Sequence, residues 1–235
     1  MKTYLSYGGG VNSTACIVLH AQGKLHYDEA IYVDHGGDWP ETREYVQMIA
    51  KRFPVTILTP NVEGVSDLYD YSLWRNMIPS RRKRWCTDKF KVRVINGYIE
   101  KPCFSLIGFS IDEAKRAKIS TKDGVENRFP LLEGEIDRQG CKDIIRDAGL
   151  PIPIKSGCYF CPFQRKGQWK LLRKRHPDLF CNAERLEDNE IEARKLIGKG
   201  PLLLAHKTKR LGDFINDKQS VLFDEMEYPP CNCGL

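Results

Sequence analysis

The stretch "LSYGGGVNSTA", residues 5–15, decides the fold of this chain. A strand-like apolar start runs into three consecutive glycines, and a Ser-Thr pair then opens a helical pattern. Such a turn presents backbone N–H groups and the positive end of a helix dipole to an anion. The glycines suit an ordinary turn equally well. The stretch is not a Walker A loop, because no Lys precedes the Ser-Thr pair, and it is not G-x-G-x-x-G, because Asn12 interrupts that spacing.

Strand and helix patterns alternate along the first half of the chain. We predict strands at residues 4–7, 29–36, 54–60 and 102–110, and helices at 13–22, capped by Asn12 or Ser13, and at 40–53. This alternation predicts an α/β domain with a parallel sheet over residues 1–135. A helical part, residues 136–235, follows with helices at 136–150, 166–180 and 182–198 and a Pro- and Cys-rich loop at 151–164. We expect it to pack on the first domain as one unit.

Composition limits the environment and the partners. The chain has 235 residues, 41% of them hydrophobic, and a net charge of +6. No apolar run is long enough for a signal peptide or a membrane span, so we expect a cytoplasmic protein without a membrane partner. The positive charge favours polyanionic partners such as nucleotides or nucleic acid.

Nine cysteines are the second strong signal. Cytoplasmic thiols stay reduced, so a metal, an iron–sulfur cluster or a reactive thiol is a better hypothesis than disulfides. Cys158 and Cys161 form a C-x-x-C knuckle between Gly157 and Pro162, which is typical of a site that presents two thiolates to one metal. We interpret Cys16 and Cys103 as core residues, and Cys141 and Cys181 have no partner at ligand spacing.

The glycine stretch resembles the PP-loop, S-G-G-x-D-S, of the adenine nucleotide α-hydrolase superfamily. Ser6, Gly9, Gly10, Asn12 and Ser13 fit this pattern with one inserted residue, and Asn12 replaces its Asp. "VDHGGDWPET", residues 33–42, resembles the D-T-G-x-x-x-P-E-T stretch of the PAPS-reductase-like branch. That resemblance implies a Rossmann-like, HUP-type domain with Asp34 near the ribose and base of the nucleotide.

Nearly the whole chain is similar to a group of PAPS-reductase-like proteins that phages and prophages often encode. The shared motifs are Gly108 to Ala114, Glu126 to Leu131, the C-x-x-C-P knuckle and a final C-G-V/L. The resemblance implies binding of ATP or PAPS, with Mg as a further candidate cofactor. The nucleotide-binding candidates are Ser6, Gly8, Gly9, Gly10, Asn12, Ser13, Thr14, Asp34 and Gly108.

The resemblance also implies a [4Fe–4S] cluster. Iron–sulfur members of the branch carry a C-C pair at the position of Trp85 and Cys86 and a C-x-x-C further on. Here Trp85 replaces the first Cys, so Cys86, Cys158 and Cys161 supply three ligands, and Cys233 in the tail is the candidate for the fourth. Zinc is the alternative, because four thiolates also form a structural zinc site.

Three functions remain open from the sequence. The first is ATP-dependent activation of an acceptor followed by sulfur transfer to a nucleic acid or a small molecule, with an external sulfur donor. The second is reduction of PAPS or APS with a thioredoxin-like reductant and Cys233 as nucleophile, although the tail lacks the Glu and His of true reductases. The third is a non-catalytic nucleic-acid-binding module held by zinc. Asn12 and Asp112 are further catalytic candidates, and the anion-binding candidates are Arg81, Arg82, Arg84, Lys89 and Arg116.

Overall fold

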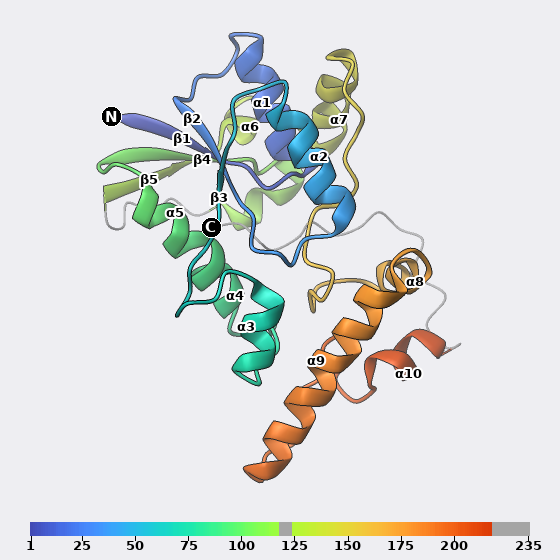
Figure 1. Cartoon of the computed structure of the whole chain (residues 1–235). Helices are drawn as coiled ribbons and strands as arrows, with labels where there is room; N and C mark the ends of the chain where they lie inside the picture. Colours follow the sequence, from blue (N-terminus) through green and yellow to red (C-terminus); the bar gives the residue numbers. More distant parts are fainter. Residues whose placement is uncertain (118–123, 218–235) are drawn as a thin grey trace.

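A five-stranded parallel sheet forms the centre of the protein. The computed structural model describes residues 1–117 and 124–217. The strands are β1 (Lys2–Ser6), β2 (Glu29–Val33), β3 (Thr56–Leu58), β4 (Cys103–Ile107) and β5 (Val125–Arg128). They lie in the order β3-β2-β1-β4-β5, and each neighbouring pair is parallel (Figure 1). The fold is therefore the predicted Rossmann-like α/β fold, with its topological switch point between β1 and β4.

Helices cover both faces of this sheet. Successive strand residues point to opposite faces, so a strand that is buried on both sides is apolar at almost every position. Leu5 and Leu106 face a cluster built with α1 (Val11–Ala21), α2 (Pro40–Ala50), α6 (Pro130–Glu133) and α7 (Arg138–Asp147). Tyr4 and Cys103 face the other side, which α5 (Arg93–Tyr98) covers. Figure 1 shows α1, α2 and α7 on one side of the sheet and α5 on the other.

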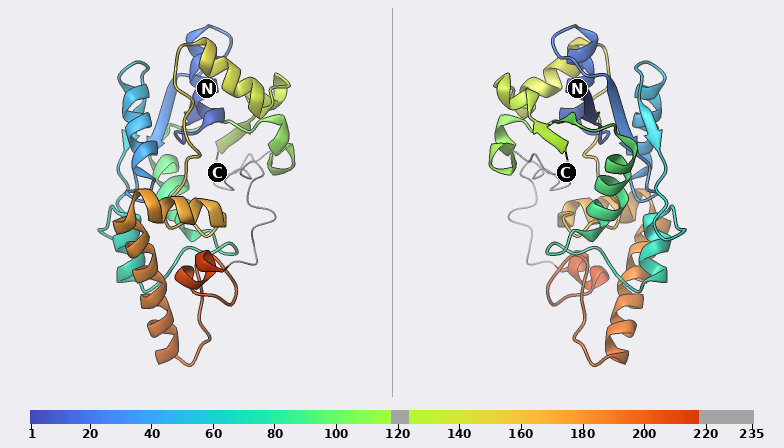
Figure 2. Two further views of the ribbon diagram at one scale, coloured as in Figure 1. Left: turned by 90° about the vertical axis from the view of Figure 1, so that its right-hand side faces the viewer. Right: turned by 90° about the vertical axis from the view of Figure 1, so that its left-hand side faces the viewer.

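A second core lies beyond one end of the sheet. It joins α3 (Leu68–Trp74), α4 (Trp85–Thr87), α8 (Lys166–Arg175), α9 (Pro177–Leu196) and α10 (Leu211–Asn216), and Figure 2 shows α8, α9 and α10 below the sheet in both views. Trp169, Tyr71 and Phe160 are fully buried there. Cys141 and Ile145 of α7 instead belong to the cluster on the sheet, although they follow the expected boundary at residue 135.

A buried acid fixes the end of this second core. Glu187 of α9 is 1% exposed, and its carboxylate accepts hydrogen bonds of 2.8 Å from the backbone N–H groups of Leu204 and Leu211. The carboxylate thereby satisfies two N–H groups that burial would otherwise leave without acceptors. Glu187 therefore ties the segment that leads into α10 to α9.

Two predicted helix boundaries were wrong. α1 begins at Val11 with Gly10 as its N-cap, and neither Asn12 nor Ser13 caps it. The charged helices divide at His176, because Pro177 disfavours helical geometry in the residue before it and itself suits the first turn of α9. None of the helices in residues 1–117 and 124–217 has both the length and the apolar character of a membrane-spanning helix.

Candidate active site

The loop between β1 and α1 and the first turn of α1 line a pocket. The Gly8 N–H donates to Ser13 Oγ at 3.2 Å, and Ser13 Oγ lies 3.3 Å from the Gly10 carbonyl oxygen. The N-cap of α1 is Gly10, which has no side chain that could accept a hydrogen bond from the first N–H groups of the helix. The first turn of α1 thus presents N–H groups and the positive end of the helix dipole to the pocket, as an anion site requires.

The glycines of this loop have different roles. Gly9 has a φ of +67°, and a Cβ on it would stand 2.7 Å from Val46 Cγ2 of α2. A Cβ on Gly108, at the end of β4, would stand 3.1 Å from the Ser13 backbone nitrogen. A Cβ on Gly8 would meet no atom within 4 Å. Gly9 and Gly108 therefore permit close packing of the backbone, whereas Gly8 faces open space.

The pocket lies at the carboxyl ends of β1 and β4, where ligands bind in open α/β sheets. The predicted nucleotide-binding residues that line it are Ser6, Gly8, Gly10, Asn12, Ser13 and Gly108. Thr14 is fully buried beside the Tyr7 hydroxyl, and Asp34 forms an ion pair of 3.1 Å with Arg43. Neither of these two residues is among those that line the pocket.

Asn12 is held in one orientation by Glu113. Its side-chain N–H₂ donates to Glu113 Oε2 at 2.8 Å and to Ser110 Oγ at 3.2 Å. Asn12 Oδ1 is consequently turned the other way, and it is buried without a hydrogen-bond donor among the described residues. A buried acceptor without a partner is costly, so the two hydrogen bonds of the N–H₂ group are what hold the Asn12 side chain in place.

Glu113 is an acidic residue of the motif Gly108 to Ala114, from which Asp112 was selected as the catalytic candidate in the sequence analysis. It is buried in the 3₁₀ helix Ile111–Arg116, where burial raises the pKa of its carboxyl despite the opposing effect of Arg116 and Arg138. Asp112 is exposed instead and accepts a hydrogen bond of 2.8 Å from the Arg138 backbone N–H. Asp112 and Glu113 both belong to the motif Gly108 to Ala114. The direction of the 3₁₀ helix places the Glu113 side chain in the pocket wall and the Asp112 side chain outside it.

Four cationic side chains also line the pocket: Lys91, Arg116, Arg138 and Lys155. Arg116 forms an ion pair with Glu113, and its guanidinium lies 4.5 Å from the centroid of the Phe109 ring. The glycine loop and these cations together suit a ligand with several negative charges, such as a nucleotide phosphate chain.

The three predicted cysteines of the described chain line a second pocket together. Cys86 lies on α4, and Cys158 and Cys161 come from the knuckle. The knuckle is held to the loop after β2, because the Tyr159 N–H donates to the Gly37 carbonyl at 2.9 Å and the Trp39 N–H donates to the Gly157 carbonyl at 3.2 Å. This backbone pairing fixes the place of Cys158 and Cys161, and Cys86, which is more than seventy residues earlier in the sequence, lines the same cavity.

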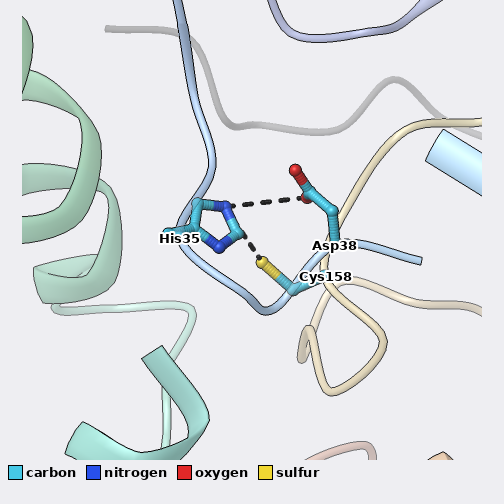
Figure 3. Close-up of side chains that lie close together, drawn as sticks. All are labelled: His35, Asp38 and Cys158. Atoms are coloured by element: carbon cyan, nitrogen blue, oxygen red, sulfur yellow. Dashed lines mark hydrogen bonds and ion pairs between the residues drawn. The ribbon is translucent and has the colours of Figure 1, made fainter. Parts of the chain in front are cut away.

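A buried histidine stands beside Cys158. His35 Nε2 lies 3.9 Å from Cys158 Sγ and 3.6 Å from Asp38 Oδ1, and Tyr32 donates to Asp38 Oδ2 at 2.7 Å. Figure 3 shows His35 and Asp38, from the loop after β2, close to Cys158 of the knuckle. Their donor atoms lie within 4.8 Å of one another, which also suits a metal ion.

The hydrogen bonds of His35 indicate that its Nε2 is a hydrogen-bond donor rather than a metal ligand. The Gly37 N–H donates to His35 Nδ1 at 3.1 Å, so Nδ1 is an acceptor. A neutral imidazole then carries its proton on Nε2, the atom that faces Asp38 and Cys158. That proton occupies the lone pair that a metal would need. Soft thiolates of Cys86, Cys158 and Cys161 therefore form the better donor set for zinc or an iron–sulfur cluster.

The basic run around residue 84 divides among several environments. Arg81 donates to the Pro162 carbonyl at 2.9 Å, and Lys89 forms an ion pair of 2.8 Å with Glu63. Arg84 lines the cysteine pocket, and Arg82 is exposed. Trp85 donates through its indole N–H to the Ile78 carbonyl at 3.2 Å and packs on Tyr71. Cys231 and Cys233 lie outside the described residues.

The two pockets adjoin. Lys91 and Gly157 line both the pocket at the glycine loop and the pocket at the cysteines. Lys91 extends from the π-helical turn Asp88–Val92, and Gly157 is the residue before the knuckle. A ligand on the glycine loop and a metal group held by the thiols would thus share one wall.

The similarities of this chain to known proteins are distant. No protein-family model matches the chain. An uncharacterised protein of Methanocaldococcus jannaschii is 24% identical over 195 residues, which are 74% of this chain and 45% of that protein. The chain therefore spans less than half the length of the curated relative that it matches. The crystal structure of phosphoadenylyl-sulfate (PAPS) reductase from Candida auris, a phosphate complex, is similar with a TM-score of 0.49 and 16% identity over 65% of this chain and 75% of that chain.

Proposed function

We propose that this protein binds ATP, or a related adenine nucleotide, on the glycine loop and transfers sulfur to an activated acceptor beside a metal group. The observation that carries the proposal is the common wall, Lys91 and Gly157, between the glycine-loop pocket and the cysteine pocket. An isolated nucleotide pocket would not need three thiols next to it, and a purely structural metal site would not need an anion pocket.

The side chains of the glycine-loop pocket suit activation of an acceptor by ATP. The N–H groups at the start of α1 bind phosphate oxygens, and Lys91 and Arg116 offset the charge that develops on the leaving pyrophosphate. An acceptor oxygen attacks the α-phosphorus, the bond to the bridging oxygen breaks, and pyrophosphate leaves. A sulfur nucleophile then displaces AMP from the acceptor.

Cys86, Cys158 and Cys161 would hold the metal group, with Cys233 as the proposed fourth ligand. A bound [4Fe–4S] cluster would supply electron transfer or a binding place for sulfur, and zinc would supply a structural cross-link. His35 donates its Nε2 proton toward Cys158 and so stabilises negative charge on that sulfur. Arg84 and Lys91, which line the same pocket, act in the same direction.

The test combines metal analysis with nucleotide binding on anaerobically purified protein. We expect iron and labile sulfide in the wild type, ATP binding by calorimetry, and loss of metal in Cys86→Ser and Cys161→Ser. Cys181→Ser is the matched control, because Cys181 is exposed and does not line the cysteine pocket. Failure to bind either ATP or PAPS would refute the proposal, and stoichiometric zinc without pyrophosphate release would favour the binding module.

Cys233 separates sulfur transfer from PAPS reduction. If Cys233 is a ligand, Cys233→Ala lowers the metal content. If Cys233→Ala keeps a full complement of metal but loses the reduction of PAPS to sulfite, the tail thiol is the nucleophile and the protein is a reductase.

A further inference from the structure

Two segments of the chain supply most of the wall of the cysteine pocket. The residues of the segment that ends in α4 which line it are Pro79, Ser80, Arg84, Cys86 and Thr87, and those of the knuckle are Gly157, Cys158, Cys161, Pro162 and Phe163. Cys86 thus comes from one segment, and the other two thiols come from the second. The three sulfur atoms can reach one metal group only while the two segments keep a fixed separation.

Arg81 links these two segments directly. Its Nε donates to the Pro162 carbonyl oxygen at 2.9 Å, and its guanidinium carbon lies 5.9 Å from the centroid of the Phe163 ring. Pro162 follows Cys161 in the sequence, so this contact lies next to one of the thiols. A hydrogen bond from a charged donor is stronger than one between neutral groups, and a guanidinium over an aromatic ring adds a cation–π attraction.

Two further hydrogen bonds hold the segment that carries Cys86. The Ile78 N–H donates to the buried carboxylate of Glu190 of α9 at 3.3 Å, and the Trp85 indole N–H donates to the Ile78 carbonyl at 3.2 Å. These bonds tie the segment to α9 and to itself, and neither of them reaches the knuckle. The three-residue helix α4 adds little stiffness, because a single helical turn is costly to form. The link through Arg81, in contrast, acts between the two segments, and so it can set the distance from Cys86 to the knuckle.

We propose that Arg81 is a positioning residue, which holds Cys86 where its thiol can share a metal group with Cys158 and Cys161. This inference rests on the proposed function, because it takes the three thiols as ligands. It gives Arg81 a role other than the anion binding that the sequence predicts for the basic run. Loss of the link should let the Cys86 segment move away from the knuckle, and the metal group should then lose the Cys86 thiolate first.

The test counts thiolate ligands with Co²⁺ as the probe, because thiolate ligands give Co²⁺ strong charge-transfer absorption in the near ultraviolet. The full-length protein is stripped of metal anaerobically and titrated with Co²⁺, and circular dichroism verifies folding. The variants are Arg81→Gln and Arg81→Lys, and the matched control is Arg82→Gln, which removes the same charge one residue later. Arg81 and Arg82 are both exposed, so neither substitution leaves a cavity in the core. Cys86→Ser gives the absorption of a site that lacks one thiolate.

We expect Arg81→Gln to bind Co²⁺ roughly tenfold more weakly than wild type, since loss of a residue that orients the ligands of a metal site costs about that factor or more. Its charge-transfer absorption at saturation should fall to that of Cys86→Ser. Arg81→Lys, whose ammonium can still donate to the Pro162 carbonyl, should keep most of the absorption, and Arg82→Gln should match wild type. A general loss of stability would weaken binding without removing one thiolate from the spectrum.

Equal affinity and absorption in Arg81→Gln and Arg82→Gln would overturn the proposal. Lower ATP affinity in Arg81→Gln with an unchanged Co²⁺ spectrum would also overturn it, because Arg81 would then be an anion-binding residue. If wild type takes up no thiolate-bound Co²⁺, the metal part of the proposed function fails as well. A wild type that binds Co²⁺ beside an unaffected Arg81→Gln refutes only the role of Arg81.

Discussion

The side-chain amide of Asn12 and the carboxylate of Glu113 are joined by a hydrogen bond of 2.8 Å in the wall of the glycine-loop pocket. An ionised carboxylate can only accept, so this bond fixes which way the amide of Asn12 faces. It also places a negative charge close to a pocket that otherwise suits an anion. Glu113 thus links the position of one ligand-binding group to the electrostatics of the site.

If the glycine-loop pocket binds ATP as proposed, we expect the charge of Glu113 to make the ATP affinity depend on pH. Burial raises the pKa of Glu113 above its ordinary value, so the carboxyl becomes neutral as the pH falls through that raised pKa. Neutral Glu113 repels phosphates less and leaves the Arg116 charge unopposed, so ATP should bind more tightly on the acid side. Glu113→Gln keeps an acceptor for Asn12 and should bind ATP about threefold to tenfold more tightly at neutral pH.

Calorimetric titration of wild type and Glu113→Gln with ATP, at neutral pH and at several lower pH values, checks the prediction. The ratio of the two affinities cancels the titration of ATP itself, and it should approach one at acid pH. A ratio that does not change with pH would show that Glu113 does not face the phosphates.

The glycine loop gives a second prediction with a built-in control. Gly8→Val points a side chain into open space within the pocket, so it should lower ATP affinity by tenfold or more while the melting temperature stays unchanged. Gly9→Val combines a positive φ with a contact of 2.7 Å to Val46 Cγ2, so it should cost about 1–3 kcal/mol of stability. Calorimetry and thermal unfolding distinguish the two effects, and normal ATP binding by Gly8→Val would place the phosphates elsewhere.

The sequence predicts the sheet and the loop well, because both depend on local patterns. Apolar strands that end in polar turns, and glycines between a strand and a helix, are visible within ten or fifteen residues. β5 was not predicted, since Val125–Arg128 is a short edge strand with three polar residues out of four. Its position beside β4 is set by pairing with the sheet rather than by its own composition.

The site needed contacts that no local pattern encodes. His35 stands in the loop after β2, and only the pairing of residues 37–39 with the knuckle brings it to Cys158. The basic run around residue 84 contains side chains that bind different partners.

His35 yields a third prediction, on the identity of the metal ligands. Because Nδ1 accepts the Gly37 N–H, the proton on Nε2 excludes metal binding through that atom. His35→Gln, which keeps both a donor and an acceptor, should therefore retain the metal of the wild type, whereas Cys158→Ser should lose it. Metal-to-protein ratios after gel filtration measure this difference, with circular dichroism to verify folding. Equal loss of metal in a folded His35→Gln protein would instead assign the site to His35, Asp38 and Cys158.

The last prediction concerns Glu187, which ties the segment before α10 to α9. Burial raises the pKa of its carboxyl even though the Leu204 and Leu211 N–H groups act in the opposite direction. The folded protein therefore binds this proton more tightly than the unfolded chain does. The contribution of Glu187 to stability is complete below the ordinary pKa of a glutamate and decreases as the pH rises through the raised pKa.

Glu187→Gln removes this titration while nearly preserving volume. At neutral pH its amide can accept only one of the two N–H groups, so we expect a loss of about 1–3 kcal/mol. Linkage then requires the difference in unfolding free energy between wild type and Glu187→Gln to increase as the pH is lowered from neutral toward about 5. Urea unfolding at the two pH values measures it. Because Glu190 and the other acids are common to both proteins, a difference that stays constant or shrinks on acidification would mean that the pKa of Glu187 is not raised in the folded protein.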